Sequence, residues 1–194
     1  MILLNQDIIE DFSTELNEIK TKPIYKNLVF DTNISKKDII ELFNKNQEET
    51  EKSIITDLFT LNLINKLICK CKKVTFSFHT IKDIPLLIDD KEEEVPLISL
   101  IKNYFKNEIV DYEEKCIFCN KIYPHEKITS IINLPEILIL SLQRFNPETR
   151  EKKNTKVIFD TTLNINPFAD ETTKDHSHCT YNLFSKNKFL KLYC

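Results

Sequence analysis

The chain has 194 residues, a formal net charge of -3, 41% hydrophobic residues and 29% charged residues. This balance is typical of a folded globular protein, and the missing basic surplus argues against nucleic acid as a partner. Glycine is absent, although its average usage is about 7%. The sequence therefore excludes mechanisms that need a glycine loop, namely the P-loop, the dinucleotide-binding fingerprint and the serine nucleophile elbow.

The sequence also carries information about the compartment. The apolar run from Met1 to Leu4 is too short for a signal peptide, and no stretch of 18 apolar residues occurs. We therefore expect no membrane partner. Six cysteines in a chain of this length do not make a small secreted disulfide scaffold. We expect an intracellular protein, cytoplasmic or nuclear, in which close cysteine pairs act as metal ligands.

The N-terminal part of the chain has helical periodicity. Apolar residues at helical spacing predict a helix over residues 7–20. A second helix is expected over residues 36–47, because Ser35 followed by Asp38 resembles a capping box ahead of an apolar run. A third helical piece is expected to start near Ser53.

The period then changes to that of a strand. Val74, Phe76 and Phe78 alternate with polar residues, which predicts a half-buried strand. Residues 89–94 form an acidic loop, and Pro96 then opens another helix. Three further strands are expected at roughly 126–134, 137–145 and 155–159. The polar run 146–154 between the last two strands suits a hairpin loop.

Two close cysteine pairs are the strongest chemical signal in the sequence: Cys69 with Cys71, and Cys116 with Cys119. Zinc takes four ligands in a tetrahedron, and thiolates satisfy it at about 2.3 Å each. We expect one zinc ion that ties two hairpins together, and a structural one, because four protein ligands leave no open position for a catalytic water. The first pair has one spacer residue fewer than the usual knuckle. Buried cysteines without metal, or a disulfide or redox role, remain as alternatives.

The other cysteines and histidines have simpler interpretations. Cys179 lies beside His178, but catalytic partners meet through the fold rather than as neighbours in the chain, so we do not expect a nucleophile there. His125 is a fifth candidate ligand, although an ordinary turn histidine explains it better. His79 lies on the polar side of its strand and is expected at the surface.

The stretch 134–145 is the most specific piece of sequence: Leu134-Pro135, an aliphatic strand and then Arg144-Phe145. Leu138, Leu140 and Leu142 are expected in the core, with Arg144 as an ion-pair partner. Five other blocks accompany it in order, at residues 53–59, 67–71, 77–86, 115–119 and 157–163. Together the six blocks resemble the ubiquitin-specific protease family of deubiquitinating enzymes. The resemblance covers residues 53–185 and extends to residue 5 through Asn5-Gln6-Asp7.

This resemblance implies a fold and a division of the chain. The fold class is α+β, a partial papain-like ubiquitin-specific protease fold with a helical N-terminal part, zinc-ribbon-like antiparallel β fingers and palm strands. Residues 1–52 would be a helical segment and a possible thumb remnant. Residues 53–185 would be the fingers and part of the palm, and residues 186–194 a divergent tail. Family fingers hold ubiquitin, so ubiquitin or ubiquitinated proteins are the implied partners.

The family's activity is thiol-dependent hydrolysis of ubiquitin isopeptide bonds. It uses a cysteine in a Gly-rich box before the fingers and a histidine in a Gly-His-Tyr box after them. Neither box occurs in these residues, and no histidine follows His178. We expect a fragment that is inactive alone, with no catalytic residue. The alternatives are a non-catalytic, zinc-stabilised ubiquitin-binding module and an unrelated zinc-ribbon interaction domain.

Overall fold

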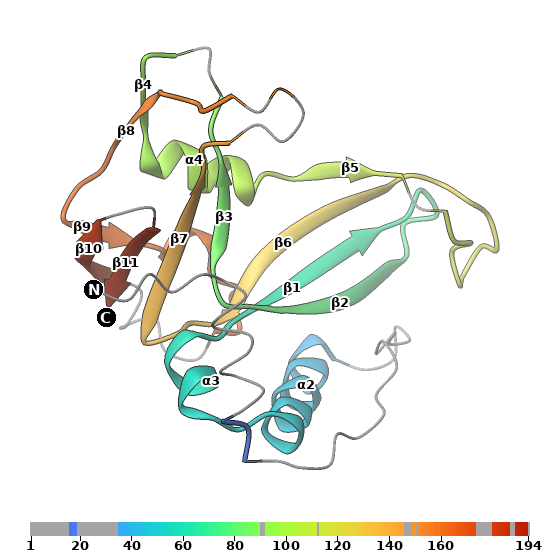
Figure 1. Cartoon of the computed structure of the whole chain (residues 1–194). Coiled ribbons are helices and arrows are strands. Elements are labelled where there is room, and N and C mark those ends of the chain that lie inside the picture. The colour runs from blue at the N-terminus through green and yellow to red at the C-terminus, as the bar shows by residue number, and fades with distance from the viewer. Residues whose placement is uncertain are drawn as a thin grey trace.

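The computed structural model describes residues 16–18, 35–89, 92–111, 113–145, 149, 151–173, 180–186 and 189–193. Over these residues the chain is α+β, as expected from the sequence. None of the helices described there is long and apolar enough to cross a membrane. Long strands extend to one side of the molecule, and α2 and α3 lie beneath them (Figure 1).

Three helices and one short 3-10 helix are described: α2 (Lys36–Thr50), α3 (Ile54–Phe59), α4 (Leu97–Tyr104) and η1 (Asn166–Phe168). The predicted cap of α2 is confirmed, and α3 begins next to Ser53, near the predicted start. Ser35 Oγ accepts a hydrogen bond from the Asp38 backbone N–H, and Ser53 Oγ accepts one from that of Thr56. Pro96 precedes α4 as expected, although it occupies the cap rather than the first helical position.

The helix predicted over residues 7–20 lies mostly outside the described residues. Residues 16–18, which are described, form a turn and a bend, so the prediction is wrong there. Tertiary hydrogen bonds explain the difference. Asn17 Oδ1 accepts from the Lys52 N–H at 3.0 Å, and Asn17 Nδ2 donates to the Thr50 carbonyl at 3.3 Å. The buried Asn17 thus satisfies backbone groups at the end of α2, where orphan carbonyls need partners.

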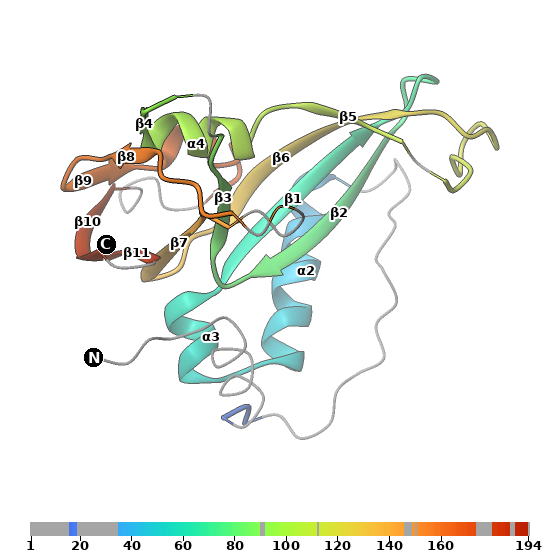
Figure 2. The same ribbon diagram turned by 45° about the horizontal axis from the view of Figure 1, so that its top comes forward.

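A four-stranded antiparallel sheet forms the extended arm of the molecule, in the order β2-β1-β6-β5. We call it the finger sheet. Its strands are β1 (Leu61–Ile68), β2 (Val74–Ile81), β5 (Glu108–Val110) and β6 (His125–Asn133). β1 and β2 pair from Leu61↔Ile81 to Ile68↔Val74 without a break. Figures 1 and 2 show these strands running side by side to the far end of the arm.

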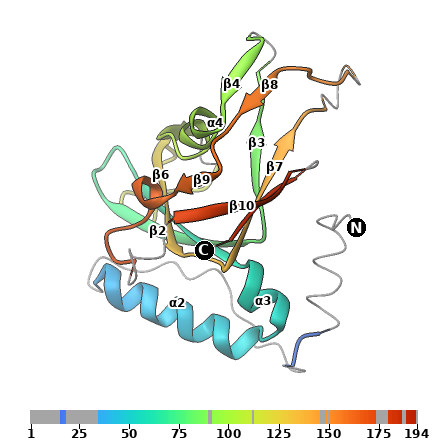
Figure 3. The ribbon, with the colours of Figure 1, turned by 90° about the vertical axis from the view of Figure 1, so that its left-hand side faces the viewer.

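Helix α2 covers one face of the finger sheet near its base, as Figure 3 shows from the side. Ile40 and Phe43 of the helix pack against Ile64 and Ile132 of the sheet. The ring of Phe43 stacks on Phe78 with centroids 4.5 Å apart, an arrangement that adds about 0.5–1.5 kcal/mol beyond area burial. The apolar periodicity seen in the sequence therefore marks the face of α2 that holds it on the sheet.

An ion pair fastens the start of α2 to the sheet, and its removal should destabilise the fold. Lys36 Nζ lies 2.6 Å from Asp170 Oδ2, and Asp170 is buried. Burial alone would raise the pKa of Asp170, but hydrogen bonds from Lys36 and Thr172 outweigh it and lower the pKa. Asp170→Asn should cost about 2 kcal/mol at neutral pH. Because the folded-state pKa is depressed, this stability is present above the unfolded pKa and is lost as pH falls through the folded value.

Urea unfolding at several pH values measures this effect. Glu171 provides the matched control, because it lies 3.6 Å from the same Lys36 nitrogen but its side chain is 83% exposed. Glu171→Gln should change the free energy of unfolding by less than about 0.5 kcal/mol. Equal losses in the two variants would contradict the assignment of the buried pair.

A five-stranded mixed sheet forms the body of the molecule, in the order β3-β7-β11-β10-β9. We call it the palm sheet. Its strands are β3 (Ile84–Leu87), β7 (Ile137–Gln143), β9 (Thr162–Asn164), β10 (Thr180–Lys186) and β11 (Phe189–Tyr193). β3 and β7 are parallel, and the other pairs are antiparallel. Residues 189–193, which were expected in a divergent tail, thus form a strand between β7 and β10.

The hairpin loop predicted between the strands at 137–145 and 155–159 closes at its base, where Phe145 and Lys152 form an antiparallel bridge and the Lys153 N–H donates to the Arg144 carbonyl at 2.6 Å. β8 (Lys156–Ile158) pairs in parallel with β4 (Glu94–Pro96) instead of returning along β7. The Arg144 guanidinium also donates to the Lys153 carbonyl at 3.4 Å, which adds to the contacts across the base of the loop. The Thr155 hydroxyl donates to the Glu92 carbonyl at 2.9 Å, so polar contacts hold this segment against the acidic loop.

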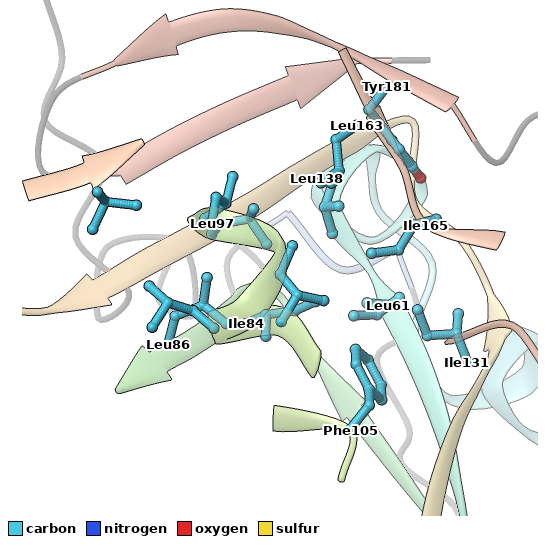
Figure 4. Close-up of a cluster of buried hydrophobic side chains, with 14 of the residues drawn as sticks. Leu61, Ile84, Leu86, Leu97, Phe105, Ile131, Leu138, Leu163, Ile165 and Tyr181 are labelled. Carbon is cyan, nitrogen blue, oxygen red and sulfur yellow. The ribbon is translucent and has the colours of Figure 1, made fainter. Parts of the chain in front are cut away.

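The main hydrophobic core lies where the two sheets and α4 meet (Figure 4). Its fully buried residues come from both sheets and from the helix, and include Leu61, Ile84, Leu86, Ile101, Ile131, Leu138, Leu140, Ile165 and Tyr181. The Tyr181 hydroxyl donates to the Pro135 carbonyl at 2.6 Å, which satisfies its buried polar atom. Leu138 and Leu140 are buried as predicted, and Leu142 packs against the core from a half-buried position.

Candidate metal centre

The four predicted cysteine ligands lie at the far end of the finger sheet. Cys69 and Cys71 lie in the turn that joins β1 to β2, and Cys116 and Cys119 lie in the loop between β5 and β6. Figure 1 shows both connections at the same end of the arm. The pairing of β1 with β6 continues to Ile68↔Glu126, next to Cys69. The hydrogen-bonded strands therefore bring the β1–β2 turn and the β5–β6 loop close together.

Each cysteine pair lies in a tight turn held by its own backbone. In the first turn the Cys69 N–H donates to the Lys73 carbonyl at 3.0 Å, and in the second the Cys116 N–H donates to the Lys121 carbonyl at 3.0 Å. Both turns need a residue with positive φ, and in a chain without glycine Lys72 (64°) and Asn120 (56°) fill that position. The left-handed conformation of Lys72, which follows Cys71, thus lets the first turn close although a single residue separates its two cysteines.

The four sulfur atoms are close enough together to hold one metal ion. All four lie within 4.8 Å of one another. Cys69 Sγ and Cys119 Sγ are 3.9 Å apart, and Cys71 Sγ and Cys116 Sγ are 3.8 Å apart. A tetrahedron with metal–sulfur bonds of about 2.3 Å has sulfur–sulfur edges of about 3.8 Å. Two of the six sulfur–sulfur distances therefore match the edge of a tetrahedral thiolate site, and thiolates are among the soft ligands that bind zinc.

Burial and backbone dipoles affect the thiols differently. Burial raises the pKa of the Cys69 thiol. Burial would also raise the pKa of Cys116, but the backbone N–H groups of Cys119 and Phe118 outweigh it and lower that pKa. N–H groups that point at sulfur stabilise a thiolate. Cys116 is therefore the thiol that favours the charged form, which is the form that binds metal.

Two lysine–aromatic contacts connect the two turns. Lys70 Nζ lies 5.5 Å from the ring centroid of Tyr123, and Lys73 Nζ lies 5.8 Å from that of Phe118. Such contacts contribute about 0.5–1 kcal/mol each at exposed sites. Sequence reasoning missed both of them, because neither lysine is distinguished by spacing and the aromatic partners lie on the other hairpin.

The remaining candidate residues lie elsewhere. His125 is the first residue of β6 and is buried, and its Nδ1 donates to the Tyr123 carbonyl at 2.8 Å rather than joining the four cysteines. His79 is exposed on β2 as predicted, and the partial desolvation of its ring, followed by the charge of Lys127, lowers its pKa. Arg144 was expected to form an ion pair, but its guanidinium donates to the Thr155 carbonyl at 2.6 Å. Cys179 lies outside the described residues.

Comparisons with known proteins agree with this architecture. The model of the ubiquitin carboxyl-terminal hydrolase family matches residues 4–187. The chain is 32% identical to chicken ubiquitin carboxyl-terminal hydrolase 2 over 146 residues, which is 71% of this chain and 40% of that protein. It is 29% identical to yeast (Saccharomyces cerevisiae) ubiquitin carboxyl-terminal hydrolase 9 over 126 residues, which is 61% of this chain and 16% of that protein.

Solved structures show the same fold. The SAGA DUB module of Ubp8, Sgf11, Sus1 and Sgf73 bound to monoubiquitin contains a chain with a TM-score of 0.57 and 21% identity, covering 76% of this chain and 35% of that one. The same module bound to ubiquitin aldehyde gives a TM-score of 0.54 and 22% identity, covering 75% and 35%.

The fold and the family model together define a protein of the deubiquitinase class. The chain belongs to the ubiquitin carboxyl-terminal hydrolase family. This membership confirms the predicted resemblance and removes the alternative of an unrelated zinc ribbon. The chain spans 40% or less of the two relatives described above, so the activity of the whole protein does not transfer to it directly.

Proposed function

We propose that this chain holds ubiquitin through zinc-tied fingers and a palm sheet, and that it performs no cleavage by itself. The cluster of four sulfur atoms at the end of the finger sheet supports this proposal most directly. One structural zinc ion on Cys69, Cys71, Cys116 and Cys119 would lock the two hairpins together and fix the shape of the arm. A zinc ion bound here would have no catalytic role, because four thiolate ligands leave no open coordination position.

The proposed division of the chain follows the family resemblance and not the two sheets, because β11, at residues 189–193, lies within the palm sheet. Residues 53–185 would serve as fingers and palm, residues 1–52 as a remnant of the thumb, and residues 186–194 as a tail that departs from the family pattern. The protein would work inside the cell, in the cytoplasm or nucleus, because close thiol pairs persist as metal ligands in a reducing compartment.

Ubiquitin is the proposed partner because the chain belongs to the ubiquitin carboxyl-terminal hydrolase family, whose model matches residues 4–187. The acidic loop is a second contact candidate. Its exposed Glu92 and Glu93 lie on a segment that Thr155 holds in place through the carbonyls of Asp89 and Glu92. A fixed acidic loop suits a basic surface on the partner.

Zinc analysis and a ubiquitin titration test the proposal together. Purified protein should contain one zinc per chain, and calorimetry should show saturable ubiquitin binding in the micromolar to millimolar range. Glu92→Lys combined with Glu93→Lys should weaken binding at low salt without changing the unfolding midpoint. Metal-free folded protein would refute the zinc part, and zinc-loaded protein that ignores ubiquitin would refute the binding part.

The isolated chain should not hydrolyse ubiquitin conjugates. The 194 residues contain neither a Gly-rich cysteine box nor a Gly-His-Tyr box, so a nucleophile with its base is missing. A fluorogenic ubiquitin substrate should give no turnover above the buffer rate. Turnover that disappears in the Cys179→Ser variant would overturn this prediction.

A further inference from the structure

We propose that the four cysteines are also an oxidative modification site. In the metal-free protein a hydroperoxide would convert them into two disulfides that cross between the hairpins, Cys69–Cys119 and Cys71–Cys116. The inference rests on the geometry of the cluster and does not depend on ubiquitin binding.

The pairing follows from the sulfur positions. The contacts at 3.9 Å and 3.8 Å each join a sulfur of the first turn to a sulfur of the second. A disulfide within the first turn would have to form across a single spacer residue, Lys70, where its dihedral angle near 90° is hard to reach. Once Cys69 pairs across to Cys119, Cys71 is left with Cys116, its neighbour at 3.8 Å.

Contacts that need no metal keep the hairpins together. The ladder between β1 and β6 extends to Ile68↔Glu126, one residue before Cys69. The Lys70–Tyr123 and Lys73–Phe118 contacts also cross from one turn to the other. The sulfur atoms therefore stay within reach of their cross-hairpin partners after the metal leaves.

Exposure assigns the roles within each pair. Cys71 and Cys119 are partly exposed, whereas Cys69 and Cys116 are buried. The outer thiolate attacks a peroxide oxygen and becomes a sulfenic acid, and hydroxide leaves. The inner thiolate then attacks the sulfenic sulfur, which forms the disulfide and releases a second hydroxide. Each pair thus consumes two thiols and one hydrogen peroxide, gives one disulfide and two waters, and needs no other oxidant.

The oxidised form would keep the arm of the molecule intact without zinc. The two disulfides join residues 50 and 45 positions apart in the sequence, and cross-links over long loops restrict the unfolded chain most. Zinc would then join the two hairpins in the reduced protein, and the two disulfides would join them in the oxidised protein.

Peptide mapping tests the pairing directly. Full-length protein carrying Cys179→Ser and Cys194→Ser is stripped of zinc with a chelator under nitrogen, treated with two equivalents of hydrogen peroxide and alkylated. Trypsin cleaves after Lys70 and separates Cys69 from Cys71, and chymotrypsin cleaves after Phe118 and separates Cys116 from Cys119. Mass spectrometry should find the two crossed pairs at least ten-fold above all other pairs. Mainly within-turn pairs, or a mixture, would overturn the proposal.

A stability measurement gives an independent readout. In the presence of chelator, the oxidised protein should melt at least 5 °C above the reduced metal-free protein, and dithiothreitol should remove the difference. Cys71→Ser with Cys116→Ser keeps one crossed pair and should retain part of the gain. An oxidised protein that melts at or below the reduced form would show that the disulfides do not fasten the hairpins, which also overturns the proposal.

Discussion

Replacing Cys116 by serine should abolish metal binding and loosen the end of the finger sheet. Cys116 is buried, and the N–H groups of Cys119 and Phe118 favour its thiolate, so its loss removes a well-prepared ligand. A structural zinc contributes its binding free energy to folding, on the order of 10 kcal/mol in small zinc-finger peptides. Here the two sheets keep their own core, so we expect a loss of about 4 kcal/mol and a melting point lower by about 10 °C.

Metal analysis and thermal unfolding in parallel check this result. The Cys179→Ser variant is the control, since it removes a thiol that is not one of the four proposed ligands. It should keep one zinc per chain and an unchanged melting point. A Cys116→Ser protein that still binds one zinc with unaltered stability would exclude the proposed ligand set.

Leu140→Ala should strongly destabilise the palm sheet. Leu140 is fully buried in β7, where the two sheets and α4 meet. Truncation of a buried leucine costs about 2–5 kcal/mol, because the transfer free energy of the removed atoms and the cavity add together. We expect a clear fall in the urea midpoint with an unchanged slope.

Leu87 offers a matched comparison in the neighbouring strand. It lies in β3 of the same sheet but is 76% exposed. Leu87→Ala should therefore change the free energy of unfolding by less than about 0.5 kcal/mol. Similar losses for the two leucines would contradict the packing described for this sheet.

Local patterns in the sequence predicted most helices and the ends of several strands. The cap at Ser35 and the start of α3 near Ser53 depend on short-range hydrogen bonds, and both predictions are correct. The alternation of Val74, Phe76 and Phe78 correctly placed β2. Arrangements that depend on contacts distant in sequence were not predicted, such as the parallel pairing of β8 with β4.

β1 shows why some strands are hard to predict. It is an inner strand of the finger sheet, between β2 and β6, and both of its faces are largely buried. Its polar residues Asn62 and Asn65 are buried with hydrogen-bond partners: Thr80 donates to Asn62 at 3.0 Å and Thr129 donates to Asn65 at 2.7 Å. A strand buried on both faces has no two-residue alternation, so periodicity cannot distinguish it from other apolar segments.

The candidate site was more predictable than the fold around it. Cysteine spacing alone indicated all four proposed ligands, because metal binding restricts the side-chain type so strongly. The supporting contacts of Lys70 and Lys73 could not be read from the sequence, since lysine and aromatic residues occur at many positions and only the fold brings these together.

The position of β11 has a consequence for biosynthesis. Residues 189–193 insert between β7 and β10, which are made earlier, so the palm sheet stays divided until β11 has left the ribosome. Until then the backbone N–H and C=O groups along one edge of β7 are unpaired and can bind a strand of another chain, which favours aggregation. The finger sheet, whose strands all lie before residue 134, can assemble first, and the nascent protein should depend on chaperones mainly during the interval before β11 appears.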